Sequence, residues 1–541
     1  MASNSIPDGT VWKAGDGLLT PLPSVEPKVD TAQPAVPSRL VGDELRTLAH
    51  ESSHYMAGLL AKLAIGLVSF PILTRVLSVS EYGIMDLAER VLLLLTVASK
   101  AGIQNASLRF YNRSEFADDV QSARRYYSTL FFGMLGTSGT VLSLCLLGAA
   151  LFPRIVNVGP LANLMYLLVG LALLRAMGSA LWGFLRIEER TKAFNVTSVA
   201  TKAATVAAVC ALLPWIGHTA RTYFVGTVGV ETVMVAGLTA WLLLRGVLAP
   251  SCFKLDLFRA AVAYGAPLIV YEFAFAILGS TDRFLVRHYL GTEALGFYAV
   301  AYGLARNVNE LLVTPLGLAL IPIYMRIWTS DGAEKTSAFL TVALDVFIMA
   351  AVGVLAAVAA SGHAVMILLA SSKYAGADRL VPVIFAALVI YAAHVFVAAG
   401  LLIHKRTLLM AGVLVISTVV NIGLNCLLLP RMGLMGGAVA TLLSYLGCIV
   451  SLAYASHRLL PLRIDLPSLA KYGLAAGAAW TMGSQLRIAA PALEFLGKSA
   501  VVITVYVVAL YALDRRVRDA VRWAVRWLQE RRLRMAGAEP L

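Results

Sequence analysis

The sequence predicts an all-α polytopic membrane protein of about fourteen transmembrane helices, built as two parallel six-helix lobes plus two C-terminal spans. Three observations support this fold class. The 541 residues are 59% hydrophobic and 14% charged, whereas soluble domains are roughly 45–50% apolar and about 25% charged. Apolar runs of about 20 residues recur between short polar loops, as a bilayer core of roughly 30 Å requires. Short sequence signatures repeat six runs apart, which predicts duplicated lobes.

The predicted spans follow these apolar runs in chain order. In the first half they cover residues 55–74, 83–102, 126–150, 160–180, 194–214 and 222–243. In the second half they cover residues 265–286, 296–325, 337–360, 380–403, 408–429, 433–456, 469–487 and 497–513. The segment from His363 to Tyr374 is too short to cross a bilayer, so it is expected to form a re-entrant or interfacial turn.

The spans define five regions of the chain. They are an arm at 1–44, an N-lobe at 45–245, a C-lobe at 246–460, the last two spans at 461–513 and a tail at 514–541. The arm is rich in proline and has no periodic apolar pattern, which predicts disorder. It contains no basic stretch followed by an apolar run of the kind that marks a signal peptide, so the first span is expected to be an uncleaved anchor.

The tail carries arginines at helical spacing. Val517 and Val521 share one helical face, and Arg518 and Arg522 share another. This pattern predicts a basic amphipathic helix that lies on the anionic lipids of the cytoplasmic leaflet. A helix that binds a partner protein is the alternative.

The distribution of charge predicts membrane orientation. The formal charge of +14 is concentrated in the tail and in alternate loops, which is typical of the positive-inside pattern and argues against a nucleic-acid partner. Taking the N-terminus as cytoplasmic, the cation-rich loops include Arg124 and Arg125, Arg186 and Arg190, Lys405 and Arg406, and Arg458 and Arg463. Both termini are therefore predicted to face the cytoplasm.

An internal repeat predicts how the lobes are related. The dipeptide "RT" at Arg190 recurs at Arg406, and "LLPWIG" ending at Gly217 recurs as "LLPRMG" ending at Gly433 with the same offset. Each copy lies six predicted spans after the first. Because six is even, both copies point the same way, and the lobes are expected to be related by an axis along the membrane normal with a cleft between them.

Three segments resemble a known family. "FPILTRVLSVSEYGIMDLA" (Phe70 to Ala88), "GAPLIVYEFAFAILGSTDRFLVRHYLGTEALGFYAVAYGLA" (Gly265 to Ala305) and "NIGLNCLLLPRMGLMGGAVATLLSY" (Asn421 to Tyr445) are similar to Wzx-type polysaccharide and O-antigen flippases of the multidrug/oligosaccharidyl-lipid/polysaccharide exporter superfamily. The resemblance covers roughly residues 45–515. It implies a bacterial inner-membrane protein that moves undecaprenyl-pyrophosphate-linked oligosaccharide by alternating access, with polysaccharide polymerase or export machinery as partners. The long proline-rich arm departs from the compact start usual in that family.

The predicted span at 296–325 provides candidates for a substrate cavity. Tyr298, Tyr302, Arg306 and Asn309 share one helical face, aromatic rings stack on sugars, and a guanidinium can bind phosphate with two hydrogen bonds. The alternative is an interfacial tyrosine belt with Arg306 neutralised by Glu310 one turn later.

Two lysines join these candidates. Lys62 and Lys202 have no local acid to pair with, and cations inside a membrane protein face cavities or partners. Both are therefore predicted to face an anionic substrate.

The predicted span at 265–286 provides candidates for ion coupling. Glu272 lies near its middle, and helical spacing places Arg283 on the same face, beside Asp282. Arg283 is assigned to the substrate cavity, and Glu272 and Asp282 are assigned to coupling with a proton or sodium gradient. An interhelical salt bridge is the alternative reading of Glu272, and a plain pair within one helix is the reading of Asp86 and Arg90.

The sequence also weighs against an enzyme. It contains no metal-binding cluster, no P-loop and no catalytic constellation, and no outward loop is long enough for one. No cofactor and no catalytic residue are therefore predicted. The alternatives that remain are a lipid II flippase, a drug or cation antiporter of the same superfamily and, as a weaker reading, a membrane polysaccharide polymerase, because fold alone does not separate substrates.

Overall fold

The computed structural model describes residues 12–13, 20–21, 38–109, 111, 119–151, 159–519 and 522. By its internal contacts the chain divides into residues 1–53 and residues 54–541. In the first unit, β1 (Trp12–Lys13) pairs antiparallel with β2 (Thr20–Pro21). The predicted arm at 1–44 lies mostly outside the described residues. Helix α1 (Ser38–Val76) contributes its residues from His54 onward to the second unit.

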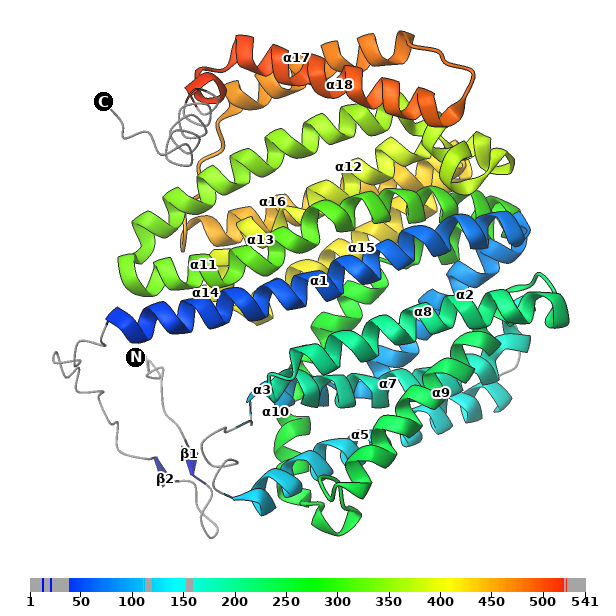
Figure 1. Ribbon diagram of the computed structural model, residues 1–541, viewed down its shortest axis with the longest axis vertical. Coiled ribbons are helices and arrows are strands. Elements are labelled where there is room, and N and C mark those ends of the chain that lie inside the picture. The colour runs from blue at the N-terminus through cyan, green and yellow to red at the C-terminus, as the bar shows by residue number, and fades with distance from the viewer. Residues whose placement is uncertain are drawn as a thin grey trace, which may run out of the picture. The chain divides into compact units, whose positions relative to one another are not determined.

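The N-lobe consists of long helices joined by short turns (Figure 1). After α1 these are α2 (Val79–Lys100), α3 (Ile103–Arg109), α5 (Val120–Leu151), the 3-10 helix η1 (Gly159–Leu164), α7 (Met165–Ile187), α8 (Thr191–Ile216) and α9 (Ala220–Leu244). Helix α7 packs against α2, α5 and α9 and is the central helix of this lobe. Its buried Leu168, Leu171 and Ala172 follow the three- and four-residue spacing of one helical face.

The remaining helices form the C-lobe and a C-terminal pair. They are η2 (Pro250–Cys252), α10 (Leu255–Leu278), α11 (Thr281–Val365), the π-helix η3 (Met366–Ala370), η4 (Ser372–Ala377), α12 (Leu380–Ala392), α13 (His394–Val397), α14 (Ala399–Ile403), α15 (Thr407–Met432), α16 (Leu434–His457), α17 (Leu466–Gln485) and α18 (Pro491–Leu513). Helix α12 packs on α11 and α16, and α17 and α18 pack on each other and on α11, at the edge of the group in Figure 1.

Helix α11 contains two of the predicted spans in its 85 residues because two glycines interrupt it. Gly291 has φ +88° and Gly332 has φ +82°, a backbone region that glycine adopts readily and other residues rarely do. Gly291 precedes the predicted span at 296–325, and Gly332 separates that span from the one at 337–360. The short segment from His363 to Tyr374 covers the end of α11, η3 and part of η4. Its residues up to Ala370 continue the candidate span that begins at Leu320, so the re-entrant or interfacial turn stays a prediction.

The all-α polytopic fold is confirmed. Ten helices in the described part of the chain are long and apolar enough to cross a membrane, or eleven if the bent pair Leu255–Ala266 and Leu268–Val313 is one span. Each predicted span overlaps one or more helices. The total of fourteen stays a prediction, partly because α2 carries Glu81, Asp86, Glu89 and Arg90 and is not among the ten.

The two copies of the sequence repeat adopt the same local geometry. Both α8 and α15 have 26 residues, and the residues before them, Arg190 and Arg406, have φ of −81° and −82°. Each helix contains a proline near its end and stops at a glycine with positive φ, Gly217 or Gly433. This similarity supports duplicated lobes, and the axis that relates them stays a prediction.

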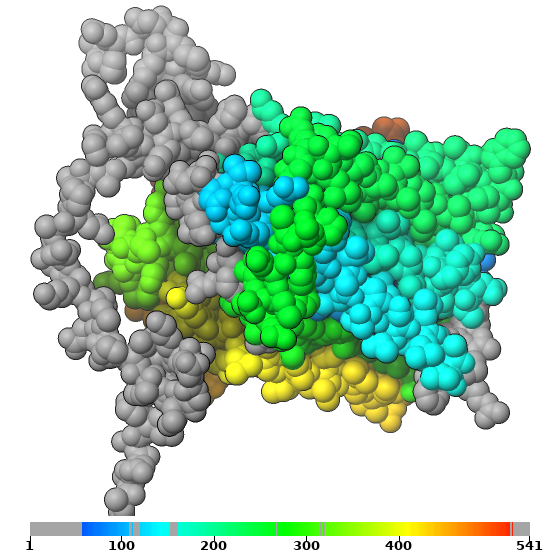
Figure 2. All heavy atoms as spheres, turned by 90° about the horizontal axis from the view of Figure 1, so that it is seen from below, coloured from blue at the N-terminus to red at the C-terminus, as the bar shows by residue number. Residues whose placement is uncertain are grey.

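The lobes meet at two places where glycines face each other. A Cβ added to Gly83 of α2 would lie 2.7 Å from the backbone nitrogen of Gly296 in α11. Gly102, before α3, similarly contacts the backbone of Gly265 in α10. Helix α10, green in Figure 2, lies between α5 in cyan and α15 in yellow, so it contacts both lobes.

Only the start of the predicted C-terminal tail is described, residues 514–519 and 522. Asp514 is buried and pairs with Lys471 of α17 at 3.5 Å. The amphipathic helix predicted for 514–541 therefore lies mostly outside the described residues.

Candidate functional site

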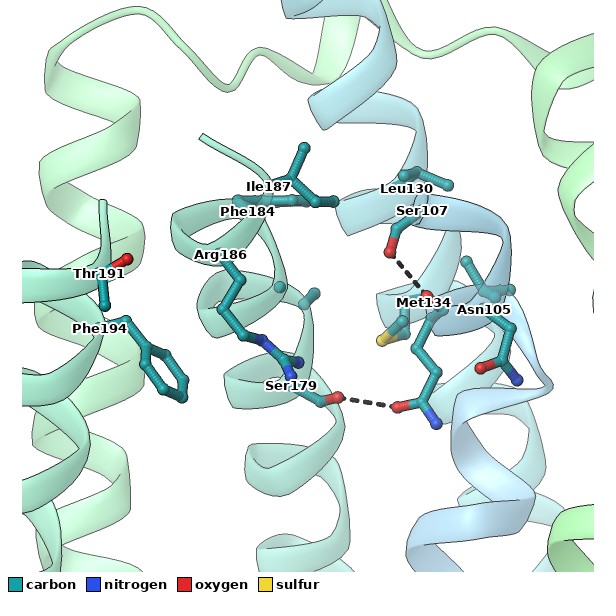
Figure 3. Close-up of a pocket in the computed structure, with 14 residues that line it drawn as sticks. Asn105, Ser107, Leu130, Met134, Ser179, Phe184, Arg186, Ile187, Thr191 and Phe194 are labelled. Carbon is teal, nitrogen blue, oxygen red and sulfur yellow. Dashed lines mark hydrogen bonds between the residues drawn. The ribbon is translucent and has the colours of Figure 1, made fainter. Parts of the chain in front are cut away.

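A cavity of about 520 Å³ lies in the N-lobe, in the half predicted to face the cytoplasm. Its lining residues come from α3, α5, α7 and α8: Ile103, Gln104, Asn105, Ser107, Leu130, Met134, Ser179, Ala180, Gly183, Phe184, Arg186, Ile187, Thr191 and Phe194. The volume is within the range of roughly 300–1,000 Å³ found for ligand pockets. Polar side chains line one wall, where Ser179 donates a hydrogen bond to Gln104 Oε1 at 2.9 Å (Figure 3).

Two cations lie near the aromatic ring of Phe194 at this cavity. Lys62 Nζ of α1 lies 5.1 Å from the ring centroid, and the Arg186 guanidinium lies 5.5 Å from it. Arg186 is exposed and Lys62 is half-buried, and Figure 3 shows Arg186 extending between Phe194 and Ser179. Lys100, at the end of α2, interacts electrostatically with Arg186. Phe194 itself is buried, so the exposed Arg186 is the cation of this group that an anionic ligand would reach first.

Glu272 lies beside this cavity at the junction of α10 with α3. Its Oε1 accepts hydrogen bonds from Gln104 Nε2 at 3.1 Å and Asn105 Nδ2 at 2.8 Å. Lys100 is its electrostatic neighbour. Glu272 thus joins α10 to α3 through amide hydrogen bonds, and no salt bridge of Glu272 is found among the described residues. Both the salt-bridge alternative and coupling through Glu272 stay predictions.

A buried ionic cluster joins α2 to α11 at the opposite end of the N-lobe. We call it the interlobe cluster: Asp86, Arg90, Asp282, Arg283, Tyr298 and Tyr302. The Arg283 side chain is 1% exposed and contacts Asp282 at 2.7 Å and Asp86 at 3.3 Å. Tyr298 donates to Asp282 Oδ2 at 2.7 Å, and the Tyr302 ring centroid lies 3.6 Å from the guanidinium.

Four of the residues predicted to line a substrate cavity or to couple an ion lie in the interlobe cluster. Asp282, Arg283, Tyr298 and Tyr302 are all buried and contact one another. The prediction that Arg283 shares the face of Glu272 was wrong, because α10 ends at Leu278 and Ser280, with φ −131°, leaves the helical conformation. The prediction that Asp86 pairs with Arg90 is confirmed at 3.1 Å.

A second ionic cluster lies inside the N-lobe. We call it the N-lobe cluster: Glu89, Arg175, Tyr223, Glu231 and their neighbour Lys202. Arg175 donates to both oxygens of Glu89, at 3.0 and 3.2 Å, and through Nε to Glu231 at 3.3 Å. Tyr223 donates to Glu89 Oε1 at 3.0 Å. Arg175 and Glu231 lie near the midpoints of α7 and α9.

Lys202, Arg306 and Asn309 are less enclosed than the four candidates in the interlobe cluster. Lys202 is exposed and has Glu89 and Arg175 of its own lobe and Arg306 and Glu310 of α11 as electrostatic neighbours. The Arg306 side chain is 41% exposed and lies 3.7 Å from Glu310, as the alternative reading predicted. Lys202 of the N-lobe and Arg306 of α11 are therefore electrostatic neighbours that come from different lobes.

Several of these residues were not candidates from the sequence. Glu89 and Tyr223 look like ordinary polar residues in apolar helices, and their roles depend on Arg175, which is 86 residues from Glu89. Gln104, Asn105 and Phe194 form the cavity only after α3, α7 and α8 pack. A signal did exist for Arg186, because it lies in a loop predicted to be rich in cations.

The fold defines an all-α polytopic membrane protein. The structure is similar to "Lipid II flippase MurJ, inward closed conformation", with a TM-score of 0.66 and 11% identity, over 86% of this chain and 99% of that one. It is also similar to the "Inward-facing conformation of a multidrug resistance MATE family transporter of the MOP superfamily", with a TM-score of 0.61 and 15% identity, over 74% and 94% of the two chains. At these identities the likeness concerns the fold.

Residues 48–328 match the family described as "Polysaccharide biosynthesis protein". The protein belongs to this family, which confirms the resemblance noted in the sequence. A comparison with curated proteins found no match.

Proposed function

We propose that the protein moves undecaprenyl-pyrophosphate-linked oligosaccharide units across the bacterial inner membrane by alternating access, for polysaccharide assembly. Membership of the polysaccharide biosynthesis family and the transporter fold support the general class. The cargo joins a dianionic or more highly charged pyrophosphate to neutral sugars, so its binding site needs cations, aromatic faces and hydrogen-bonding side chains close together.

One observation carries the assignment of cargo. Lys62 and Arg186 both lie within cation–π distance of the Phe194 ring, at a cavity that Gln104 and Ser179 also line. The cations suit the pyrophosphate, and the ring and polar wall suit a sugar. Lys202 of the N-lobe and its electrostatic neighbour Arg306 of α11 add two further cations, and we call these four residues the cationic surface.

Reconstituted protein tests the cargo directly. Liposomes would contain a fluorescent undecaprenyl-pyrophosphate-linked disaccharide, and flipping would be read as its accessibility to a membrane-impermeant glycosidase. Parallel arms would use lipid II and a cationic dye, since a lipid II flippase and a drug antiporter are the alternative functions. We expect fast movement of the disaccharide carrier. Movement of only lipid II or only the dye would contradict the proposal.

A pair of substitutions tests the cationic surface. Arg306→Ala is expected to lower polysaccharide export more than Arg306→Lys, because lysine keeps the charge and loses the planar fork. The half-exposed pair with Glu310 contributes at most about 1 kcal/mol to stability, so the loss should not come from misfolding. Glu310→Gln, which removes the partner and keeps the cation, is the matched control and should export near the parental level. Equal and near-parental export from both Arg306 variants would assign Arg306 to packing.

The proposal extends to energy source and partners, which rest on the sequence. A proton or sodium gradient, anionic lipids at the C-terminal tail and polysaccharide polymerase or export machinery are proposed on that ground. The inner membrane and the cytoplasmic position of both termini are proposed from the distribution of loop charge.

A further inference from the structure

The N-lobe cluster has an unequal distribution of hydrogen bonds. Glu89 accepts two hydrogen bonds from Arg175 and one from Tyr223. Glu231 accepts one, from Arg175 Nε, at 3.3 Å. Arg175 and Tyr223 therefore stabilise the charge of Glu89 strongly, and Glu231 is the acid whose charge is least supported.

The negative charge of Glu231 is not balanced within the cluster. Arg175 balances Glu89, so the triad with Glu231 has a net charge of −1. The remaining cation is Lys202 on α8, which is an electrostatic neighbour of Glu231 but is not within ion-pair distance in the described residues. Lys202 also interacts with Arg306 and Glu310 of α11. Arg90 of α2 is a more distant neighbour on the Glu89 side.

The position of the cluster makes an uncompensated charge costly. Arg175, Lys202 and Glu231 lie near the midpoints of three apolar helices, α7, α8 and α9. An acid at that depth needs a cation, water or a proton. The Glu231 side chain is 13% exposed and that of Arg175 is 29% exposed, so neither side chain is fully enclosed by the lobe.

We propose that Glu231 is the proton-binding carboxylate of the transporter and that it exchanges its proton against the charge of Lys202. Protonation converts the carboxylate and one proton into a neutral carboxylic acid, and Arg175 then remains paired with Glu89. In the deprotonated state, the charge of Glu231 attracts Lys202 away from Arg306 and Glu310 of α11. A proton on Glu231 is thereby coupled to the cationic surface shared by the two lobes. This inference rests on the proposed transport function.

A measurement without cargo tests the proton site alone. Difference infrared spectra of the purified protein in lipid, recorded across a pH titration, show the carbonyl band of any carboxylic acid that gains a proton. We expect a band that is lost in Glu231→Gln and kept in Glu494→Gln, a matched half-buried glutamate that pairs with Lys498 in α18. Glu272→Gln in the same titration tests the rival coupling site. A band that persists in Glu231→Gln, or is absent from the parental protein, would overturn the proposal.

A second measurement connects the site to transport. Flipping of the fluorescent disaccharide carrier would be compared with and without an imposed pH gradient. Glu231→Gln should lose the stimulation by the gradient and keep gradient-independent exchange, because glutamine preserves size but binds no proton. Lower exchange at every gradient, together with a lower melting temperature, would make Glu231 a structural residue. The infrared titration can show a band that is lost in Glu231→Gln while the parental protein moves no disaccharide carrier. That result would contradict the assigned cargo and would leave the proton site supported.

Discussion

The interlobe cluster and the N-lobe cluster share one ionic motif and differ in burial. Each has an arginine between two carboxylates and a tyrosine that donates to one of them. Arg283 is 1% exposed and links two lobes, whereas Arg175 is 29% exposed and lies within one lobe. The same residue types therefore serve two purposes. The buried interlobe cluster fixes helices in one arrangement, whereas the more exposed N-lobe cluster can change its protonation.

A third arginine completes the series at the surface. Arg516, in the described part of the tail, lies 3.0 Å from Asp465 and 3.7 Å from Asp345, and Tyr472 donates to Asp345 at 3.0 Å. The Arg516 side chain is 66% exposed. The motif of an arginine, two carboxylates and a tyrosine is again present. A comparison of the three sites therefore separates the effect of burial on stability from the effect of residue type.

The largest effect is expected at Arg283. Arg283→Met leaves Asp282 buried without a cation and should cost about 3–5 kcal/mol, because an unpaired buried charge is strongly destabilising. The apparent melting temperature in detergent measures this. Adding Asp282→Asn should restore part of the loss, since a neutral amide needs no cation. If Arg283→Met alone is as stable as the parental protein, the two clusters do not differ in their contribution to stability.

An intermediate effect is expected at Arg175. Arg175→Met leaves Glu89 and Glu231 without their shared cation, and partial exposure to solvent limits the cost to about 1–3 kcal/mol. Thermal melting measures the cost, and the infrared titration should show protonation of a carboxyl group at higher pH than in the parental protein. A cost equal to that of Arg283→Met would show that exposure does not control these clusters.

The smallest effect is expected at Arg516. Arg516→Met should change stability by less than about 1 kcal/mol, and high salt should remove the difference, because exposed ion pairs are screened. Hydrogen bonding from Ser468, with Arg516 nearby, holds the pKa of Asp465 below its ordinary value. The contact is therefore present above the ordinary carboxylate range and is lost as the pH falls through the lowered pKa. A melting-temperature series in acid and in salt checks both points.

The fold was largely predictable because the bilayer imposes it. An apolar run of span length forms a helix because the backbone N–H and C=O groups must be hydrogen-bonded inside the bilayer. Every predicted span accordingly overlaps a helix. Contacts one turn apart, such as Asp86 with Arg90 and Arg306 with Glu310, were also accessible because helical spacing fixes them.

The candidate sites were only partly predictable because they depend on contacts far apart in sequence. Asp86 and Arg283 are 197 residues apart, and no local pattern announces their approach. The break at Ser280 also carried Arg283 away from the face of Glu272. A polar residue in an apolar helix could thus be identified as a candidate from the sequence. The sequence did not show which of these residues contact one another.

The glycine contact between α2 and α11 affects how the lobes separate. At Gly83 and Gly296 the two helix backbones come into direct contact, with the Val79 side chain beside them. Buried apolar side chains of both helices, such as Tyr82 and Leu295, pack into one core around this contact. Separating the helices here therefore exposes apolar surface and also withdraws Arg283 from Asp86, so the kinetics of opening at this end should respond both to changes in hydrophobic packing and to changes in charge.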